Sequence, residues 1–357
     1  MNIKKALVNL CCGLLIWNKA KRRAVREVLF PTLSYYPPLG PNEQWVFVED
    51  FLPMGGIMWS DYLLSHNMPE MLADLRHGLD NESNELLDLI FSRMTIFPRG
   101  SWNNYRVRDS FLDTLVTQQE KEFLENFRME LPAYRKEFKL DENCYNFDTF
   151  YFHNSLRWSS EKLKKYIAGK DFIDGGAYIG DSALVYIKRY DPRCVYSFEI
   201  SEKTCARYEN VMRMNNIPAD KYKLVPMGLS DKKQEIMMND SAYQGTSIFY
   251  KGTSKVQLTD IDSFTQENNL NVGFIKADVE GVGLEATLGM TETIKRDRPV
   301  VYVAMYHNPQ EFFEIKPALE KITSELGYKF SIVKEYLLAD RMLEVAVFAY
   351  PKELDHE

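Results

Sequence analysis

The residues best suited to chemistry begin with a short block that closes one apolar run and opens the next element. Asp174 ends the run and is followed by a glycine-rich turn up to Gly180, and Glu199 ends a second apolar run one helix length later. Glycines at such a turn let a ligand approach the backbone, and a helix that starts near Asp181 offers unpaired N–H groups. A carboxylate such as that of Glu199 can accept hydrogen bonds from ribose hydroxyls. The block therefore predicts a site for a nucleoside-containing cofactor.

The turn departs from the fingerprint of dinucleotide-binding proteins. That fingerprint is G-x-G-x-x-G, and Ala177 stands at its third position. Together with the absence of a second glycine-rich phosphate loop in the sequence, this disfavours a nicotinamide-dependent oxidoreductase. The predicted cofactor-binding residues are Asp174, Gly175, Gly176, Ala177, Gly180 and Glu199.

A second block, Phe274 to Gly281, ends another apolar run with alternating charged residues. An extended strand would place Lys276, Asp278 and Glu280 on one face. A carboxylate there can orient or deprotonate a hydroxyl, and a nearby cation can stabilise the resulting oxyanion. Because Lys276 and Glu280 fit a structural ion pair and a helix cap equally well, Asp278 is the main functional candidate.

A histidine completes the set of candidate catalytic residues. His307 follows the apolar run from Val300 to Tyr306, and its ordinary pKa suits a general base near neutral pH, while a structural role fits it nearly as well. The predicted catalytic residues are therefore Asp278, His307 and Lys276. The scattered histidines are interpreted as structural, and they are His66, His77 and His153.

The elements that must position these residues begin at about residue 165, where apolar runs alternate with amphipathic segments such as Ser201 to Asn215. Such alternation predicts an α/β fold with a mostly parallel sheet and helices on both faces. Ligands bind beyond the carboxyl ends of parallel strands, so the candidate residues should meet there. Two final apolar runs, 329–334 and 344–350, predict an antiparallel hairpin at one edge of the sheet.

Residues 31–160 are interpreted as a smaller, mainly helical accessory region. One helix is expected over residues 70–93, with Gly78 as an interruption, and another over residues 109–128. No catalytic motif stands out, although the aromatic and amide residues at 102–106 suit contact with a sugar as well as a loop packed on the core. We expect this region to select the acceptor substrate.

Residues 1–30 form a basic segment, with seven Lys and Arg residues against Glu27 alone. The apolar stretch at residues 6–17 is shorter than the about 20 residues that cross a bilayer, and no small-residue cleavage site follows it. A helix here would be amphipathic and could lie on an anionic membrane surface. Packing on the protein itself, or a frayed tail, is equally well supported.

Composition limits the class of protein further. The chain has 357 residues, of which 45% are hydrophobic, and a formal net charge of −7. It can therefore bury a sizeable core, and its acidity disfavours nucleic acid as a partner. Five cysteines without Cys/His ligand spacing predict neither a disulfide framework nor a metal site. We expect a cytoplasmic protein, and a peripheral position at the inner face of the membrane is one of the two alternatives for its basic N-terminal segment.

Several blocks, in order along the chain between about residues 165 and 350, resemble the FkbM family of S-adenosylmethionine-dependent methyltransferases. These blocks are Phe172 to Gly180, Ser197 to Glu199, Thr259 to Phe264, Ile275 to Gly281 and Pro299 to His307. The resemblance implies a class I methyltransferase domain over residues 161–351, with a Rossmann-like seven-stranded sheet. It also implies S-adenosyl-L-methionine as cofactor, with Asp174, Gly176 and Gly180 on its methionine side and Glu199 on its ribose.

The resemblance further implies methyl transfer to a hydroxyl, commonly of a sugar or a polyketide-like acceptor. We expect a glycan or glycolipid precursor, because the basic N-terminus would keep the protein near the membrane where such acceptors reside. Two residues depart from the family pattern. Tyr178 stands where many relatives have Asn, and Gly283 stands where many have a second Glu. The second departure leaves open a non-catalytic, cofactor-binding scaffold, and an NAD-dependent oxidoreductase is the less favoured alternative.

Overall fold

The computed structural model describes residues 43–46, 56–96, 105–108, 116–141, 144–238, 254–335 and 344–355. The basic segment at residues 1–30 and the stretch at residues 102–104 lie outside these ranges. Among the helices that are described, none is both long enough and apolar enough to cross a membrane.

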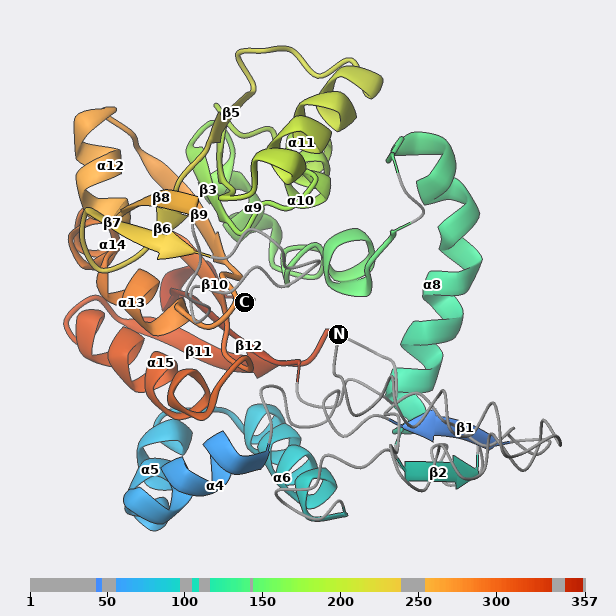
Figure 1. Cartoon of the computed structure of the whole chain (residues 1–357), viewed down its shortest axis with the longest axis vertical. Helices are drawn as coiled ribbons and strands as arrows, with labels where there is room; N and C mark the ends of the chain where they lie inside the picture. Colours follow the sequence, from blue (N-terminus) through green and yellow to red (C-terminus); the bar gives the residue numbers. More distant parts are fainter. Residues whose placement is uncertain are drawn as a thin grey trace, which may run out of the picture. The chain divides into compact units, whose positions relative to one another are not determined.

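The larger of two compact units contains residues 46–105 and 110–357. A seven-stranded sheet forms its centre (Figure 1). Its order is β11-β12-β10-β9-β3-β4-β5. The strands are β3 (Asp171–Gly175), β4 (Val195–Phe198), β5 (Tyr222–Val225), β9 (Val272–Ala277), β10 (Val300–Ala304), β11 (Tyr328–Val333) and β12 (Ala346–Pro351). Five neighbouring strands pair in parallel, while β12 runs antiparallel to both β10 and β11. This arrangement confirms the predicted α/β class I sheet and its edge hairpin.

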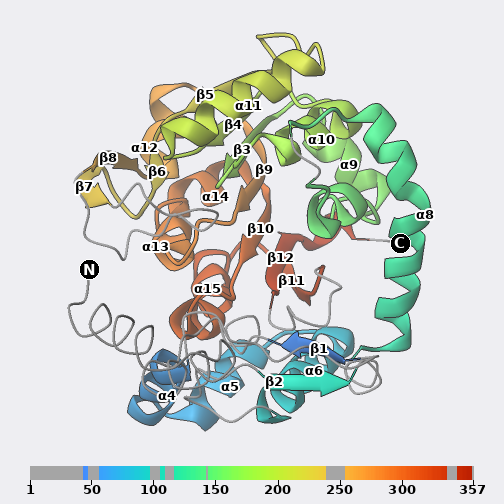
Figure 2. The same cartoon turned by 45° about the vertical axis from the view of Figure 1, so that its right-hand side comes forward.

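Alternate strand residues point to opposite faces of the sheet, and both faces are buried. Phe172 and Phe274 belong to one hydrophobic cluster, and their neighbours Ile173 and Ile275 belong to another. The first cluster includes residues of α9 (Glu161–Ile167), α10 (Asp181–Tyr190) and α11 (Glu202–Met214). The second includes residues of α12 (Ile261–Glu267), α13 (Gly283–Leu288), α14 (Thr291–Asp297) and α15 (Pro309–Ile322). Figure 2 shows these two groups of helices on either side of the strands, as the sequence predicts.

Three helices before the sheet pack on its second face. They are α4 (Gly56–Ser65), α5 (Met68–Arg76) and α6 (Asn81–Ile96), and they contact α15 and β11. The helix expected over residues 70–93 is thus two helices. Gly78, with a φ of +66°, lies between them, where left-handed backbone favours glycine.

The helix expected over residues 109–128 is displaced toward the C-terminus. Helix α8 spans Gln118–Glu137, and residues 109–115 lie outside the described chain. Thr117 forms a capping box with Glu120, in which each side chain bonds the other residue's backbone N–H, so the helix starts there. The prediction missed this cap because it followed hydrophobic spacing alone.

The remaining described elements are short. A three-stranded sheet in the order β6-β8-β7 contains Gly228–Leu229, Ser254–Thr259 and Gln234–Met238. A π-helical turn, η1 (Asp148–Phe152), packs on α10, and a 3-10 turn, η2 (Lys352–Leu354), follows β12. Strands β1 (Glu43–Val46) and β2 (Tyr105–Arg108) pair with each other. The predicted domain boundaries at residues 30 and 160 stay predictions.

Candidate functional site

Strand register places a row of polar side chains across the carboxyl end of the sheet. Asp174 pairs with Ser197 on one side and with Lys276 on the other, and Lys276 pairs in turn with Tyr302. Paired residues in adjacent strands point to the same face, here the face that α10 covers. Asp174 is fully buried, and its Oδ2 accepts a hydrogen bond from Ser182 Oγ at 2.8 Å.

Lys276 holds the glycine turn in place. Its Nζ donates to the carbonyl oxygens of Gly175 (3.1 Å) and Gly176 (2.8 Å) and lies 3.5 Å from Asp174 Oδ1. The buried ammonium is therefore committed to the backbone of the turn. This contact gives Lys276 a structural role, which is one of the two roles that the sequence left open. Its partners are the carbonyl oxygens of the turn and not Glu280.

The glycines of the turn are required by close packing. Gly176 has a φ of +72°, and a Cβ there would lie 1.8 Å from the carbonyl oxygen of Asp278. Gly180 has a φ of +83°, and a Cβ there would lie 2.7 Å from the ring of Tyr208. Ala177 is buried in the hydrophobic cluster under α10, and its N–H donates to Phe198 O at 3.0 Å. The turn is thus fixed against strands β4 and β9.

Glu199 fastens the turn to the end of β4. Its Oε2 accepts from the backbone N–H of Tyr178 at 3.1 Å, and its Oε1 accepts from that of Ser201 at 2.9 Å. Burial raises the pKa of Glu199 despite these bonds. The side chain of Tyr178 lies beside Arg207, whose guanidinium also forms two hydrogen bonds with Asp141. The carboxylate is therefore oriented by the backbone, in the place where the sequence predicts contact with ribose.

His307 lies between carboxylates at the ends of β9 and β10. Its Nε2 is 3.2 Å from Asp278 Oδ1 and 3.7 Å from Glu280 Oε2, and its Nδ1 is 3.1 Å from Glu311 Oε2. Burial alone would lower the pKa of His307, but Asp278 and Glu311 outweigh burial and hold that pKa well above its ordinary value. Burial likewise tends to raise the pKa of Asp278, and the charges of His307 and Lys276 lower it instead.

The pair therefore consists of an imidazolium and a carboxylate near neutral pH. A protonated His307 has no lone pair with which to take a proton, so this surrounding does not suit the general-base role expected from the sequence. Asp278 keeps the ability to accept one. Strand β9 ends at Ala277, and Glu280 has a φ of +50°, so the chain does not stay extended through Glu280 as the single-face expectation required.

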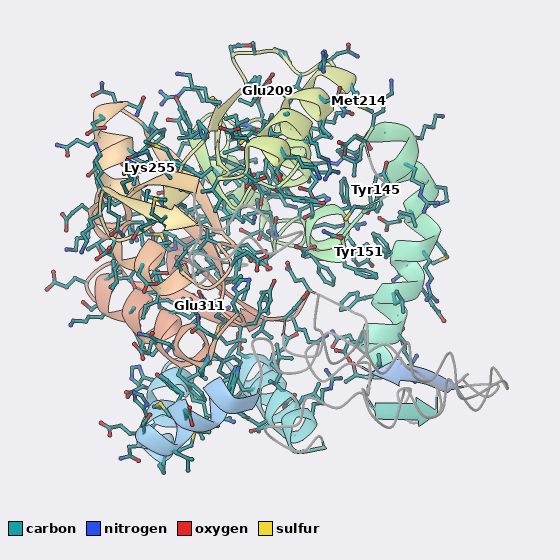
Figure 3. All side chains as sticks on the ribbon, viewed as in Figure 1. Tyr145, Tyr151, Glu209, Met214, Lys255 and Glu311 are labelled. Carbon is teal, nitrogen blue, oxygen red and sulfur yellow. The ribbon has the colours of Figure 1, made fainter. Side chains whose placement is uncertain are left out.

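Glu311 is a member of the site that sequence reasoning missed. It is 1% exposed, and its Oε1 accepts from the backbone N–H of Gly283 at 2.6 Å. A carboxylate thus lies beside Gly283, supplied by α15 (Glu311 is labelled in Figure 3). Asn308 caps α15 by accepting from Glu311 N–H at 2.8 Å. An N-cap Asn followed three residues later by Glu was the signal that could have located it.

A second group that the sequence missed lies before β3. Residues His153, Asn154 and Ser155 all have left-handed backbone, with φ values of 53°, 49° and 67°. Asn154 Oδ1 accepts from Tyr186 OH at 2.5 Å, and Ser155 Oγ donates to Glu335 Oε1 at 2.6 Å. Three consecutive residues in this strained region are held by surrounding bonds and mark a functional-site candidate.

Buried acids before β3, in α10 and after β11 interact with one another: Asp148 acts on both Asp181 and Glu335. Burial, with the charge of Asp278, raises the pKa of Asp148 to about 6. Burial, with the charge of Asp148, raises the pKa of Asp181 to about 7, and burial raises that of Glu335 to about 8. Within the described chain, six buried atoms of this region have no hydrogen-bond partner: Asp148 Oδ1, Asn154 Nδ2, Asp174 Oδ1, Asp278 Oδ1, His307 Nε2 and Glu335 Oε2.

Residues 174–330 match the family model described as the methyltransferase FkbM domain. Over 82% of this chain, the fold resembles a crystal structure of methyltransferase FkbM from Methylobacillus flagellatus KT, with a TM-score of 0.52 and 15% identity. The match covers 61% of that protein, so this chain spans less than two thirds of its length. No curated protein matches the sequence.

Two further solved structures align more loosely. An O-methyltransferase from Bacillus cereus in complex with SAH aligns over 64% of this chain and 90% of its own, with 15% identity and a TM-score of 0.36. An rRNA methylase from Streptococcus thermophilus aligns over 54% of this chain and 92% of its own, with 9% identity and a TM-score of 0.35. The family match and the sheet agree with the blocks found in the sequence, and residues 174–330 of this chain form a domain of the FkbM methyltransferase family.

Proposed function

We propose that this protein is an S-adenosyl-L-methionine-dependent O-methyltransferase that acts on a hydroxyl of a glycan or glycolipid precursor. The observation that carries the proposal is the contact between the glycine turn and the end of β9, where Gly175 O accepts from Asp278 N–H at 3.0 Å. This contact brings the predicted cofactor side of the site next to the carboxylate that would meet the acceptor.

The residues present fit the cofactor. Glu199 is oriented at the end of β4 to receive ribose hydroxyls, because a carboxylate can accept further hydrogen bonds beside those from the backbone N–H groups of Tyr178 and Ser201. Asp174 Oδ1 is buried and has no hydrogen-bond partner in the described chain, so it suits a cationic ligand. When bound, S-adenosyl-L-methionine supplies an electrophilic methyl group on a positively charged sulfur.

Asp278 is the residue that we assign to the acceptor hydroxyl. Methyl transfer to the acceptor oxygen would make the hydroxyl proton strongly acidic, and Asp278 would be the group that receives this proton. A carboxylate can take that proton late in the reaction even when its pKa is low, and the proton then passes to solvent. The imidazolium of His307, 3.2 Å from Asp278 Oδ1, would hold the carboxylate in orientation.

The acceptor class rests on the sequence. Seven basic residues within residues 1–30 suit attraction to an anionic membrane surface, where glycolipid precursors reside. We propose a peripheral position at the inner face of the membrane on that basis. Mass spectrometry of cell-envelope glycans with and without this protein tests the acceptor, and loss of one CH₂ unit per acceptor residue is the expected result.

Calorimetry of the intact protein tests the cofactor. We expect S-adenosyl-L-methionine to bind, Glu199→Ala to weaken binding by about tenfold or more because ribose contacts are lost, and NADH not to bind. Glu202→Ala, an exposed carboxylate at the start of α11, is the matched control and should bind as wild type does. No binding by the folded wild-type protein would overturn the proposal, and binding of NADH alone would favour an oxidoreductase.

Turnover separates an enzyme from a scaffold. A protein that binds the cofactor but transfers no methyl to a broad panel of acceptors would be a non-catalytic scaffold. The scaffold alternative arose because Gly283 stands where many relatives have Glu. Glu311 places a buried carboxylate beside Gly283, which favours the enzyme over the scaffold.

A further inference from the structure

We propose that Asp148, which precedes the matched domain, supplies a counter-charge for the cationic part of the cofactor, namely its sulfonium and amino groups. The inference rests on the proposed function and adds a residue outside residues 174–330 to the same site. No block of the family resemblance includes Asp148.

The position of Asp148 is set by the packing of η1 on α10. The aromatic residues of η1, Phe150 and Tyr151, are buried in the same cluster as the residues under α10 (Tyr151 is labelled in Figure 3). Asp148 O accepts from Asn154 N–H at 2.8 Å. These contacts fix the turn, and from it the charge of Asp148 acts on Lys276 and Asp181 in the structure without a ligand.

The charge balance around Lys276 is the argument for a cation. Burial tends to lower the pKa of Lys276, and four carboxyl groups acting together raise it. These four are Asp174, Asp278, Asp181 and Asp148. The ammonium is already bonded to two carbonyl oxygens, so a single cation faces four acids.

The neighbouring imidazolium does not remove this imbalance. His307 lies within ion-pair distance of Asp278, Glu280 and Glu311, so its one charge comes with two further carboxyl groups, those of Glu280 and Glu311. Unpaired buried carboxylates are costly and respond by holding protons, as the raised pKa values of Asp148 and Asp181 indicate. A cationic ligand would allow these groups to ionise, whereas an anionic or neutral one would not.

Unsatisfied atoms within this group point to a ligand independently of its charge. Asp174 is fully buried, and its Oδ1 faces Lys276 at 3.5 Å without a hydrogen bond in the described chain. Asp148 Oδ1 is likewise buried and without a hydrogen-bond partner there. Native structures leave few such atoms, and amino hydrogens of a ligand can satisfy oxygens of this kind.

Calorimetry with S-adenosyl-L-methionine and S-adenosylhomocysteine tests the inference. We expect Asp148→Asn to weaken S-adenosyl-L-methionine binding by about tenfold, as loss of one close charge does. S-adenosylhomocysteine lacks the sulfonium charge but keeps the amino group. If Asp148→Asn weakens the binding of both ligands equally, Asp148 lies near the amino group. If the variant weakens the binding of S-adenosylhomocysteine less than that of S-adenosyl-L-methionine, Asp148 lies near the sulfonium. Either result supports the proposal.

The matched control is Asp191→Asn, which removes an exposed carboxylate bonded to Lys221 and should not change affinity. Asp148→Asn should melt at or above the wild-type temperature without ligand, because it removes a buried charge that costs free energy. If it does not fold, Asp148→Ser tests the same charge with the same expected loss. If a folded variant without this carboxylate binds S-adenosyl-L-methionine as tightly as wild type, only the inference about Asp148 is overturned. If the wild-type protein does not bind S-adenosyl-L-methionine, the proposed function is overturned.

Discussion

The two sides of the site are held together by different forces. On the β3–β4 side, the glycine turn is fixed by close packing and by backbone hydrogen bonds, including those that Glu199 accepts from two backbone N–H groups. On the β9–β10 side, Asp278, His307 and Glu311 are fixed by charge. Changes of side-chain volume should therefore have the larger effect on the first side, and changes of charge should have the larger effect on the second. The predictions below test this contrast.

The largest effect is expected from volume on the first side. Gly176→Ala places a Cβ 1.8 Å from the carbonyl oxygen of Asp278, a backbone atom that cannot move away cheaply. We expect a loss of more than about 3 kcal/mol in the free energy of unfolding, or no folded protein, with cofactor binding abolished. Urea denaturation followed by circular dichroism measures the loss.

Gly169→Ala is the control for backbone strain. Gly169 has the same φ of +72° but nothing within 4 Å of its added Cβ. It should therefore cost only about 1 kcal/mol, the strain of a non-glycine residue in left-handed backbone. Equal losses in the two variants would show that strain, and not contact with β9, explains the glycine.

The next largest effect is expected from charge on the second side. Glu311→Gln keeps the volume and an oxygen for Gly283 N–H, but it removes the negative charge beside His307 Nδ1. We expect the pKa of His307 to fall and methyl transfer to slow by about a hundredfold. NMR titration of the imidazole measures the first change. Glu314→Gln, on the same helix and bonded to Tyr62, should change neither quantity.

The sign of the pH dependence follows from the raised pKa of His307. The ion pairs of the folded state contribute their full stability below the ordinary pKa of about 6.5 and lose it as the pH rises through the higher folded-state value. The difference in unfolding free energy between wild type and Glu311→Gln should therefore be greatest near pH 6 and shrink in alkali. A difference that grows with pH contradicts an imidazolium.

The same contrast explains what the sequence can predict. The glycine turn, Asp174, Glu199 and Asp278 lie within a few residues of apolar strands, so local spacing locates them and the sheet that carries them. Glu311 and Asp148 reach the site only through the packing of α15 and η1, which hydrophobic spacing does not describe. The partners of Lys276 in the glycine turn were likewise invisible, because they depend on the register between β3 and β9.

A moderate effect is expected from the acid that follows β11. Burial raises the pKa of Glu335 to about 8, so the folded protein holds a proton there that the unfolded chain has released above about pH 4.3. Stability should fall as the pH rises from that value through 8. Glu335→Gln resembles the protonated acid, so we expect little change near pH 4 and a gain relative to wild type that grows by up to about 1.4 kcal/mol per pH unit until it levels off above pH 8. Thermal unfolding across pH checks this, and a gain that is constant with pH contradicts it.

The smallest effect is expected at Tyr178, the residue of the turn that departs from the family pattern. Its φ of +45° lies in the left-handed region, which Asn adopts with less strain than Tyr. Tyr178→Asn should recover part of about 1 kcal/mol of strain and lose a cation–π contact with Arg207 worth about 0.5–1 kcal/mol. These nearly cancel, and the backbone N–H to Glu199 is kept, so unfolding free energy and cofactor affinity should both stay close to wild type.

Tyr178→Val loses the same contact and adds a β-branched side chain in left-handed backbone, so it should be clearly less stable. If Asn proves as damaging as Val, the tyrosine ring itself supports the turn, and side-chain contact has to be added to shape and backbone bonds on this side of the site.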